Sequence, residues 1–299
     1  MAEIELTLQE AADLLGVHYM TAYRYVRLGL LHASKPSGTW RVARADLDAF
    51  QVSNSITTTV GGLGNGSGES GRRRAPWAER LQSRLIAGDS RGAWGVIEAA
   101  LAAGADLDEI YTDVIGPAMS AIGADWEAGQ LDISLEHRAT GIAMRLIGRL
   151  GPRFVRRGRT RGAVVVGAPV GEFHSLPVAM LADLVRGGGW DVSDLGADVP
   201  DASLVHAVGS IADLIAVGLS VTNPGCLDSA RSACSALRQA YPDLLLIVGG
   251  SAVDGEDTAV LLGAHGYAPD GRHFIELLET RRAELRGGSG DRQTMLSDG

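Results

Sequence analysis

The region from 163 to 269 alternates short apolar runs with segments of helical period. The apolar runs read AVVVGA, WDVSDLG, DLIAVGLS, LLLIVGG and HGYAP. Helical segments lie between them near 175–186, 201–210, 228–241 and 256–262. Apolar strands that alternate with helices predict a parallel sheet covered on both faces. We therefore predict a doubly wound α/β domain over 160–285, with any ligand bound beyond the carboxyl ends of the strands.

The preceding region, 76–155, has the period of helices throughout. Four segments place apolar residues three and four positions apart. The breaks between the segments fall at Gly88-Asp89, Gly104 and Gly129. Short connections favour antiparallel neighbours, so these segments predict a four-helix bundle. Trp126 falls at the end of the third helix and Glu136-His137 in the first turn of the fourth, so they can meet at one end of the bundle.

The first 50 residues (1–50) form a separate small unit. Thr7 and Glu10 have the spacing of a capping box, which predicts a helix that Gly16 ends. A second helix follows after a tight turn, then two extended pieces around Ser37-Gly38 and a third helix over 44–50. This layout resembles the winged helix-turn-helix of the excisionase and MerR families, and a small helical interaction domain is the alternative.

DNA binding by this unit would use polar groups of the second helix and the wing. The side chains able to reach bases or phosphates are His18, Tyr19, Thr21, Arg24, Arg27, Lys35 and Arg41. The first 50 residues are not net basic, which predicts weak binding by one copy alone. Operator affinity then requires several linked units in a homo-oligomer, a dimer or tetramer.

The bulk composition excludes several classes of protein. A formal net charge of −9 argues against a nucleic-acid-binding surface over the whole chain. Two cysteines are too few for a disulfide framework. No apolar run approaches the roughly 18 residues of a membrane span, so we expect a cytoplasmic protein without a membrane partner. Gly- and Ser-rich composition predicts a flexible linker over 51–75 and a disordered tail over 286–299.

The loop after the first strand of the α/β domain carries Glu172 and His174 in place of a glycine-rich phosphate cradle. A metal-ligating imidazole commonly donates its second ring nitrogen to a carboxylate, and Glu172 is spaced for that role. The ends of later strands add hydroxyls at Ser220 and Thr222. Gly249 and Gly250 permit close approach of a bulky ligand there.

These positions together resemble the signature of the cobalamin-binding domain family. The family pattern is an acidic residue and a histidine two apart, then S-x-L, then G-G. The resemblance implies that His174 is the lower axial cobalt ligand and that the nucleotide tail passes the Ser220 and Gly249 positions. Pro177 stands for a glycine of the pattern and Thr222 for its leucine, which puts the entry of the tail in doubt.

The bundle adds a second resemblance. Trp126, nine residues and then Glu136-His137 match the spacing in light-sensing, corrinoid-binding transcriptional regulators of the CarH/LitR type. The resemblance implies that these side chains cover the upper ligand of adenosylcobalamin, or of methylcobalamin. Light would then cleave the cobalt–carbon bond, loosen the oligomer and release DNA. Light-sensing members have a histidine directly after the tryptophan, and here Glu127 occupies that position.

The sequence thus predicts a binding and switching protein without catalytic residues. One alternative is a regulator that senses the corrinoid without photochemistry. Another is a corrinoid methyl carrier of a methyltransferase system, which the helix-turn-helix unit disfavours. The chain is too short to include the substrate barrel of a cobalamin mutase.

Overall fold

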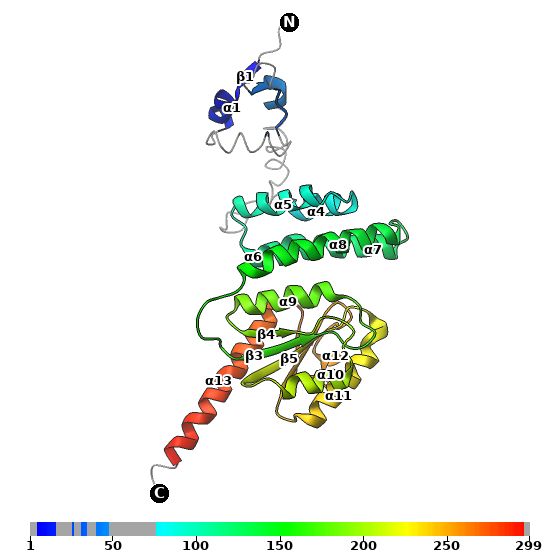
Figure 1. Ribbon diagram of the computed structural model, residues 1–299, viewed down its shortest axis with the longest axis vertical. Coiled ribbons are helices and arrows are strands. Elements are labelled where there is room, and N and C mark those ends of the chain that lie inside the picture. Colours follow the sequence, from blue (N-terminus) through cyan, green and yellow to red (C-terminus); the bar gives the residue numbers. More distant parts are fainter. Residues whose placement is uncertain (1–4, 16–25, 27–30, 35–39, 48–75, 296–299) are drawn as a thin grey trace, which may run out of the picture. The chain divides into compact units, whose positions relative to one another are not determined.

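The structure is a computed structural model. It describes residues 5–15, 26, 31–34, 40–47 and 76–295. The chain divides into two compact units, Met1–Pro76 and Trp77–Gly299, and each is considered by itself (Figure 1). No described helix is long and apolar enough to span a lipid bilayer.

In the first unit, strand β1 (Glu5–Thr7) leads directly into helix α1 (Leu8–Leu15). The predicted capping box is confirmed: the Thr7 amide donates to the Glu10 carboxylate at 2.7 Å, and the Glu10 amide donates to the Thr7 hydroxyl at 3.3 Å. These bonds also lower the pKa of Glu10. The sequence did not predict β1, which pairs antiparallel with β2 (Arg41–Ala43).

The wing region is described in part. The Ser34 and Arg41 backbones exchange two hydrogen bonds of 2.8 Å, as expected for paired extended pieces on either side of a turn. A small core joins these pieces to α1 through Leu8, Leu31 and Val42. Arg41 is half-buried. The other predicted DNA contacts lie outside the described residues, namely His18, Tyr19, Thr21, Arg24, Arg27 and Lys35.

The second unit begins with the predicted four-helix bundle. Its elements are α4 (Trp77–Ile86), α5 (Ser90–Ala102), α6 (Leu107–Glu109), the π-helical segment η1 (Ile110–Ile115), α7 (Gly116–Glu127) and α8 (Ile133–Leu150). The segments α6, η1 and α7 run on as one long third helix. The three expected breaks contain Gly88, Gly104 and Gly129, all at positive φ, where glycine is favoured. Asp132 caps α8 by accepting from the Ser134 amide at 2.8 Å.

A short 3-10 turn, η2 (Gly151–Arg153), connects the bundle to a five-stranded sheet. The strands are β3 (Ala163–Gly167), β4 (Asp191–Asp194), β5 (Leu214–Ser220), β6 (Leu245–Gly249) and β7 (Gly266–Ala268). Their order is β4-β3-β5-β6-β7, and every pairing is parallel. The direction of winding reverses at β3, and ligands bind at such a switch point in sheets of this kind.

Helices cover both faces of the sheet, which confirms the doubly wound prediction (Figure 1). They are α9 (Ser175–Gly187), α10 (Asp201–Gly209), α11 (Leu227–Ala240), α12 (Glu256–Leu262) and α13 (Gly271–Met295), with the 3-10 turn η3 (Pro224–Cys226) before α11. Alternate residues of β3 enter two cores: Val165 packs with α10–α12, and Val164 and Val166 pack with α9 and α13. The bundle core extends onto α9 through Leu176 and Leu184.

The C-terminal end corrects one expectation. Composition predicted a disordered tail over 286–299, but α13 continues to Met295 and projects beyond the sheet (Figure 1). Its first turns are anchored by the buried Phe274 and Leu278. Once a helix is nucleated, each added residue contributes another backbone hydrogen bond, which outweighs the glycine-rich composition here.

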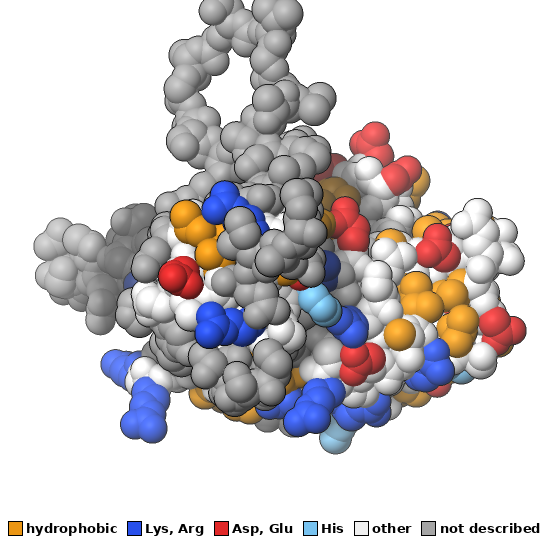
Figure 2. Space-filling model, turned by 90° about the horizontal axis from the view of Figure 1, so that it is seen from above, with side chains coloured by type: hydrophobic (Ala, Val, Ile, Leu, Met, Phe, Trp, Pro, Cys, Tyr) orange, Lys and Arg blue, Asp and Glu red, His pale blue; other side chains and the backbone are white. Residues whose placement is uncertain are grey.

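The surface has mixed charge. Figure 2 shows acidic and basic side chains interspersed over the visible described surface. The two cysteines, Cys226 and Cys234, are free and buried, as expected for ordinary small core residues.

Candidate functional site

The loop between β3 and α9 holds a buried carboxylate. Glu172 is 1% exposed and accepts five hydrogen bonds. Oε2 accepts from the Thr222 amide and hydroxyl at 2.7 and 3.1 Å and from the Asn223 amide at 2.7 Å. Oε1 accepts from the amide and ring of His174. The carboxylate therefore ties the loop after β3 to the loop after β5 at the switch point.

The backbone of the loop is held in addition. Gly171 adopts positive φ, and its amide donates to the Asp198 carboxylate at 2.8 Å. The Asp198 amide in turn donates to the Glu172 carbonyl at 2.9 Å. Three loops, after β3, β4 and β5, therefore fix the position of Glu172.

Electrostatics keep the Glu172 carboxyl ionised. Burial opposes the charge, but the hydrogen bonds from Asn223, His174 and Thr222 outweigh burial and lower the pKa of Glu172. Backbone amides and a ring N–H that donate to both carboxylate oxygens favour the charged form of the carboxyl group. The site is therefore built around an anionic carboxylate at neutral pH.

His174 receives its orientation from this carboxylate. Its Nδ1 lies 2.5 Å from the Glu172 Oε1, while the His174 side chain is 61% exposed. A carboxylate acceptor places the proton on Nδ1, so Nε2 carries a free lone pair. His174 also immediately precedes α9, which fixes its backbone. The pair thus presents one imidazole nitrogen as an oriented ligand for a metal.

No group of three or more His, Cys, Asp or Glu in the described part of the chain is arranged to hold a metal ion. A metal held mainly by its own macrocycle needs only one axial imidazole from the protein. The donor set around His174 suits such a cofactor, since a single oriented nitrogen faces outward.

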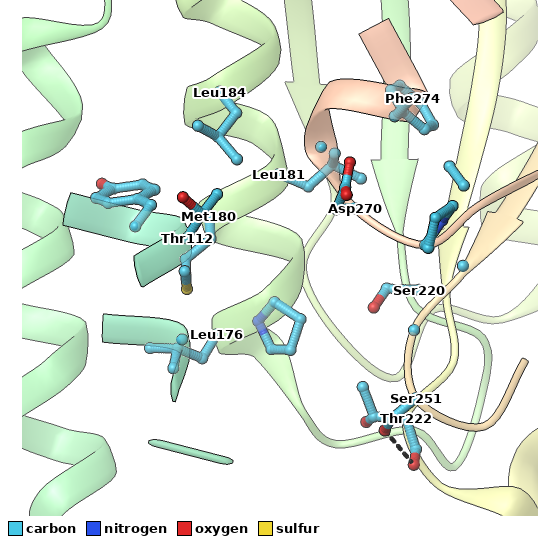
Figure 3. A pocket seen from close by; sticks show the side chains of 18 of the residues that line it. Thr112, Leu176, Met180, Leu181, Leu184, Ser220, Thr222, Ser251, Asp270 and Phe274 are labelled. Atoms are coloured by element: carbon cyan, nitrogen blue, oxygen red, sulfur yellow. Dashed lines mark hydrogen bonds between the residues drawn. The ribbon is translucent and has the colours of Figure 1, made fainter. Parts of the chain in front are cut away.

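A cavity of about 480 Å³ lies beside this loop. Figure 3 shows α9 between the bundle and the sheet, with Leu176 and Met180 on its bundle side and Leu181 on its sheet side. The wall beyond the strand ends contains four predicted residues, Ser220, Thr222, Gly249 and Gly250. The structure therefore brings together the S-x-L and G-G positions in one cavity, and Thr222 links them to Glu172.

The structure gives a reason for glycine at positions 249 and 250 that the sequence did not predict. A Cβ on Gly249 would lie 2.2 Å from the Ala268 carbonyl oxygen, and one on Gly250 would lie 2.3 Å from the Val221 carbonyl oxygen. Gly250 also has φ near +101°. Close approach of the protein's own backbone thus requires glycine here, whatever the ligand.

Several cavity residues were not predicted. The bundle contributes Tyr111, Thr112, Gly116, Pro117, Met119 and Ser120, the loop after β7 contributes Asp270, and α13 contributes Phe274. The Gly116-Pro117 pair inside the third helix was a usable signal, because proline in a helix interior removes a backbone hydrogen bond. The helix is π-helical over Ile110–Ile115, directly before this pair. Such bulges often occur at functional sites.

The other predicted residues lie at the end of the bundle formed by the α7–α8 turn. Trp126 is 43% exposed and ends α7 with the exposed Glu127. His137 Nδ1 lies 2.6 Å from Glu136 Oε2, and the Thr140 hydroxyl donates to Glu136 Oε1 at 2.7 Å. None of these residues lines the 480 Å³ cavity. An exposed aromatic beside polar groups leaves this end of the bundle free to contact a ligand.

A buried polar contact joins the bundle to α9. The Tyr111 hydroxyl donates to the Asp183 carboxylate at 2.8 Å, and Arg186 donates to the other oxygen at 2.9 Å. Burial, and then the bond to Asp183, raises the pKa of Tyr111, so the phenol remains a donor. Gly151 packs against the same carboxylate, where a Cβ would lie 2.9 Å from an Asp183 oxygen. Bundle and α/β domain thus share one buried network.

Comparison with known families identifies each region. Residues 77–150 and 162–277 match two models described as B12 binding domain, and residues 5–55 match a helix-turn-helix domain. The HTH-type transcriptional repressor CarH of Myxococcus xanthus is 30% identical over 192 residues, which are 63% of this chain and 62% of that protein. The chain resembles cobalamin-binding regulators of the CarH type. This result confirms the resemblance predicted from the motifs.

The B12-binding region has other relatives. Trimethylamine corrinoid protein 1 of Methanosarcina acetivorans is 30% identical over 119 residues, covering 37% of this chain and 53% of that protein. The chain therefore spans between half and two thirds of the length of these curated relatives. The structure of the Methanosarcina barkeri monomethylamine corrinoid protein superposes with a TM-score of 0.58 at 18% identity. It covers 68% of this chain and 98% of that one, and it shows a shared fold.

Proposed function

We propose that the chain is a cobalamin-binding transcriptional regulator in which His174 is the lower axial ligand of cobalt. The observation that carries the proposal is the buried Glu172 carboxylate, which accepts from the His174 ring at 2.5 Å. The imidazole is thereby oriented as a single ligand, and no group of three or more metal-binding side chains occurs among the described residues. The two B12-binding-domain matches and the helix-turn-helix match support the same function.

The residues beside His174 fit the rest of such a cofactor. The cavity between α9 and the strand ends has the polar groups of Ser220 and Thr222 in a largely apolar wall, which suits a nucleotide tail. Their hydroxyls would orient the tail, and the α9 side chains would exclude water from it. Pro177 is tolerated at this position because it lies in the first turn of α9.

The finer proposal is that adenosylcobalamin is the bound form and light is the input. When bound, this cofactor supplies a cobalt–carbon bond that visible light can cleave. Trp126, Glu136 and His137 would cover the upper ligand, the indole by apolar contact and the other two by hydrogen bonds. Their exposure leaves them able to contact the ligand from the α7–α8 end of the bundle.

The Tyr111–Asp183 contact supports coupling between the ligand and the bundle. Because the hydroxyl and the carboxylate are both buried, a shift of the bundle that broke this bond would leave the phenol without its acceptor and one Asp183 oxygen without its donor. Such a penalty favours two discrete positions over a continuous drift. We propose that the two positions differ in homo-oligomer assembly, and that loss of linked DNA-binding units lowers operator affinity.

A second candidate is a regulator that responds to the corrinoid without photochemistry. Glu127 favours it, because this exposed carboxylate stands where light-sensing relatives have a histidine. A carboxylate is a poorer partner than imidazole for cobalt in a corrin. The similarity to corrinoid proteins also supports a methyl carrier, against which the helix-turn-helix match argues.

The test uses the full-length protein loaded in darkness with adenosylcobalamin. The visible spectrum, the oligomer size and the affinity for its own promoter DNA are measured before and after green light, with methylcobalamin and cofactor-free samples alongside. The light-sensing proposal expects all three to change only in the illuminated adenosylcobalamin sample. Unchanged size and affinity, despite a spectral change, support the non-photochemical regulator. Absence of promoter binding in every sample contradicts the regulator and favours the methyl carrier.

The His174→Ala variant tests the ligand in the same spectra. A dark spectrum identical to that of the parent protein rules out His174 as the lower ligand. His206→Ala is the matched control, because His206 is an exposed histidine on α10, away from the cavity wall.

A further inference from the structure

A second cavity lies at the opposite end of the sheet from the Glu172 loop. It has a volume of about 380 Å³ and is enclosed by the segment before β3 and the turn between α9 and β4. Its lining is Val155 to Arg161, Arg186 and Gly188 to Val192. The segment 153–161 contains five arginines and no acidic residue, in a chain of net charge −9. This concentration of positive charge is not used by the proposed cobalamin site.

The two walls of the cavity are fastened together. The Arg161 amide donates to the Gly189 carbonyl at 3.0 Å, and the Asp191 amide donates to the Gly162 carbonyl at 3.0 Å. Arg161 also forms an ion pair with Glu279 of α13. The arginine segment is therefore held against the α9–β4 turn and is part of the folded unit.

Five arginines line the cavity, and carboxylates neutralise only part of their charge. Arg156 interacts electrostatically with Asp108. Arg186 is paired with Asp183, and Arg161 with Glu279. Arg157 and Arg159 are exposed, and no ion pair is found for either within the described part of the chain. Asp191 is the one carboxylate among the described lining residues. The cavity therefore has a net positive potential.

The cavity wall also contains a hydrogen-bond donor without an acceptor. Trp190 is 3% exposed, and its buried indole Nε1 has no hydrogen-bond partner. The Arg282 guanidinium lies 5.9 Å from the centre of the Trp190 ring. A buried donor without an acceptor destabilises the folded state. The exposed arginines favour a ligand that brings several acceptor oxygens, and Trp190 in the cavity wall lies close enough to report its binding.

We propose that this cavity binds a small phosphate ester or inorganic phosphate. The guanidinium groups of Arg157 and Arg159 supply the donors. Paired arginines favour phosphate because the planar guanidinium donates two hydrogen bonds to adjacent oxygens. The concave shape favours a small ligand over a DNA duplex. The proposal does not depend on the cobalamin site.

The experiment titrates the full-length protein with inorganic phosphate, adenosine 5′-monophosphate and a duplex of unrelated sequence, all at matched ionic strength set with sodium chloride. The indole N–H signals are followed by NMR, and Trp190→Phe assigns the Trp190 signal by its disappearance. We expect phosphate or the monophosphate to shift this signal with a saturable curve. Arg157→Gln/Arg159→Gln should weaken binding about tenfold or more, the size of losing charge-assisted hydrogen bonds.

Arg153→Gln is the matched control, since Arg153 is an exposed arginine of the same segment outside the cavity lining. It should bind as the parent protein does. Arg157 and Arg159 are exposed, so the Arg157→Gln/Arg159→Gln variant should fold even if Trp190→Phe does not. Its affinity for phosphate therefore decides the proposal. Absence of saturable binding of either small ligand, or equal weakening by Arg153→Gln, overturns the proposal. Binding of the duplex alone overturns it too and assigns the arginines to nucleic acid.

Discussion

Two glutamate–histidine pairs of the second unit, Glu172–His174 and Glu136–His137, have nearly the same internal geometry and different surroundings. The ring Nδ1 lies 2.5 Å from the carboxylate in Glu172–His174 and 2.6 Å in Glu136–His137. Glu172 is 1% exposed and bonded to two loops, whereas the Glu136 side chain is 21% exposed. Its other bond is to Thr140, one turn along the same helix.

The contrast separates an anchor from an adjustable contact. Moving His174 would require breaking bonds that fix the switch point of the sheet. Moving His137 requires only rotation of an exposed side chain, which costs little. A permanent metal ligand needs the first kind of support, and a group that contacts one upper ligand but not another needs the second kind. The same two residue types therefore serve different purposes because of what lies behind the carboxylate.

The largest effect expected from breaking this contrast is that of His174→Ala. Loss of the only oriented imidazole in the loop should abolish the spectral shift that accompanies cobalt ligation by the protein. Affinity for cobalamin should fall by at least about a hundredfold, the upper end of what loss of a supporting residue causes. Visible spectra and equilibrium dialysis measure both. The same substitution at His137 should leave the lower-ligand spectrum unchanged.

Glu172→Gln should have the next largest effect. The glutamine side chain is neutral, and one of its two polar atoms is a donor, so it cannot accept all the hydrogen bonds that the Glu172 carboxylate accepts. The His174 ring then loses the acceptor that fixes its tautomer. Cobalamin affinity should fall by about 10- to 100-fold, and the free energy of unfolding by about 1–3 kcal/mol. Dialysis and chemical denaturation provide the measurements. Glu136→Gln is the control, and an equal loss of stability there would remove the distinction between the pairs.

The pH dependence of the same variant sharpens the comparison. The folded-state pKa of Glu172 is lowered, so its stabilising contribution is present above the unfolded pKa of about 4.3. It is lost as pH falls through the folded value. The difference in unfolding free energy between parent and Glu172→Gln should therefore be constant near neutral pH and shrink in acid. A difference that grows on acidification would contradict the assignment.

Trp126→Ala should have a smaller and more selective effect. Trp126 is 43% exposed, so stability should change by no more than about 0.5 kcal/mol. The preference for adenosylcobalamin over methylcobalamin should decrease by about two- to tenfold, the size of an aromatic contact. Competition between the two forms on the full-length protein measures this preference. Trp77→Ala, at the far end of the bundle sequence, should leave the preference unchanged.

His137→Ala should have the smallest effect. It removes one exposed hydrogen-bonding group and should reduce the same preference by about two- to fivefold, without a change in the His174-dependent spectrum. A larger loss than that of Trp126→Ala would mean that the polar pair, and not the indole, dominates recognition of the upper ligand.

Local patterns were enough to predict most of the fold. Strand and helix runs after Ala163 predicted all five parallel strands, because the central strands β3, β5 and β6 are apolar runs. The Glu172–His174 pair was predictable because both residues lie in one loop. Its long-range partners were not, since the Thr222 and Asn223 amides are backbone groups that any residue type would provide. The reason for Gly249 also depended on a neighbouring strand, which composition does not specify.

Contacts between the bundle and α9 could not be predicted from the sequence for the same reason. Tyr111 resembled an ordinary core aromatic of a helical segment, and Asp183 an ordinary surface acid of another. Their hydrogen bond depends on packing between two helical segments, and the two residues are 72 positions apart in the sequence. Likewise, the helical course of 286–295 depended on the turns before it and not on its own composition.

The Tyr111–Asp183 bond has a consequence for how such a chain can be recombined. The first B12-binding match ends at residue 150 and the second begins at residue 162. The buried Asp183 carboxylate on α9 lies in the second match, yet it accepts the hydrogen bond of Tyr111 in the first. A chimera joined between residues 150 and 162 would place Tyr111 against the α9 of another protein and would leave its buried hydroxyl without the Asp183 acceptor. A transferable sensing module must therefore carry α9 along with the bundle, so the unit of exchange is larger than either B12-binding segment alone.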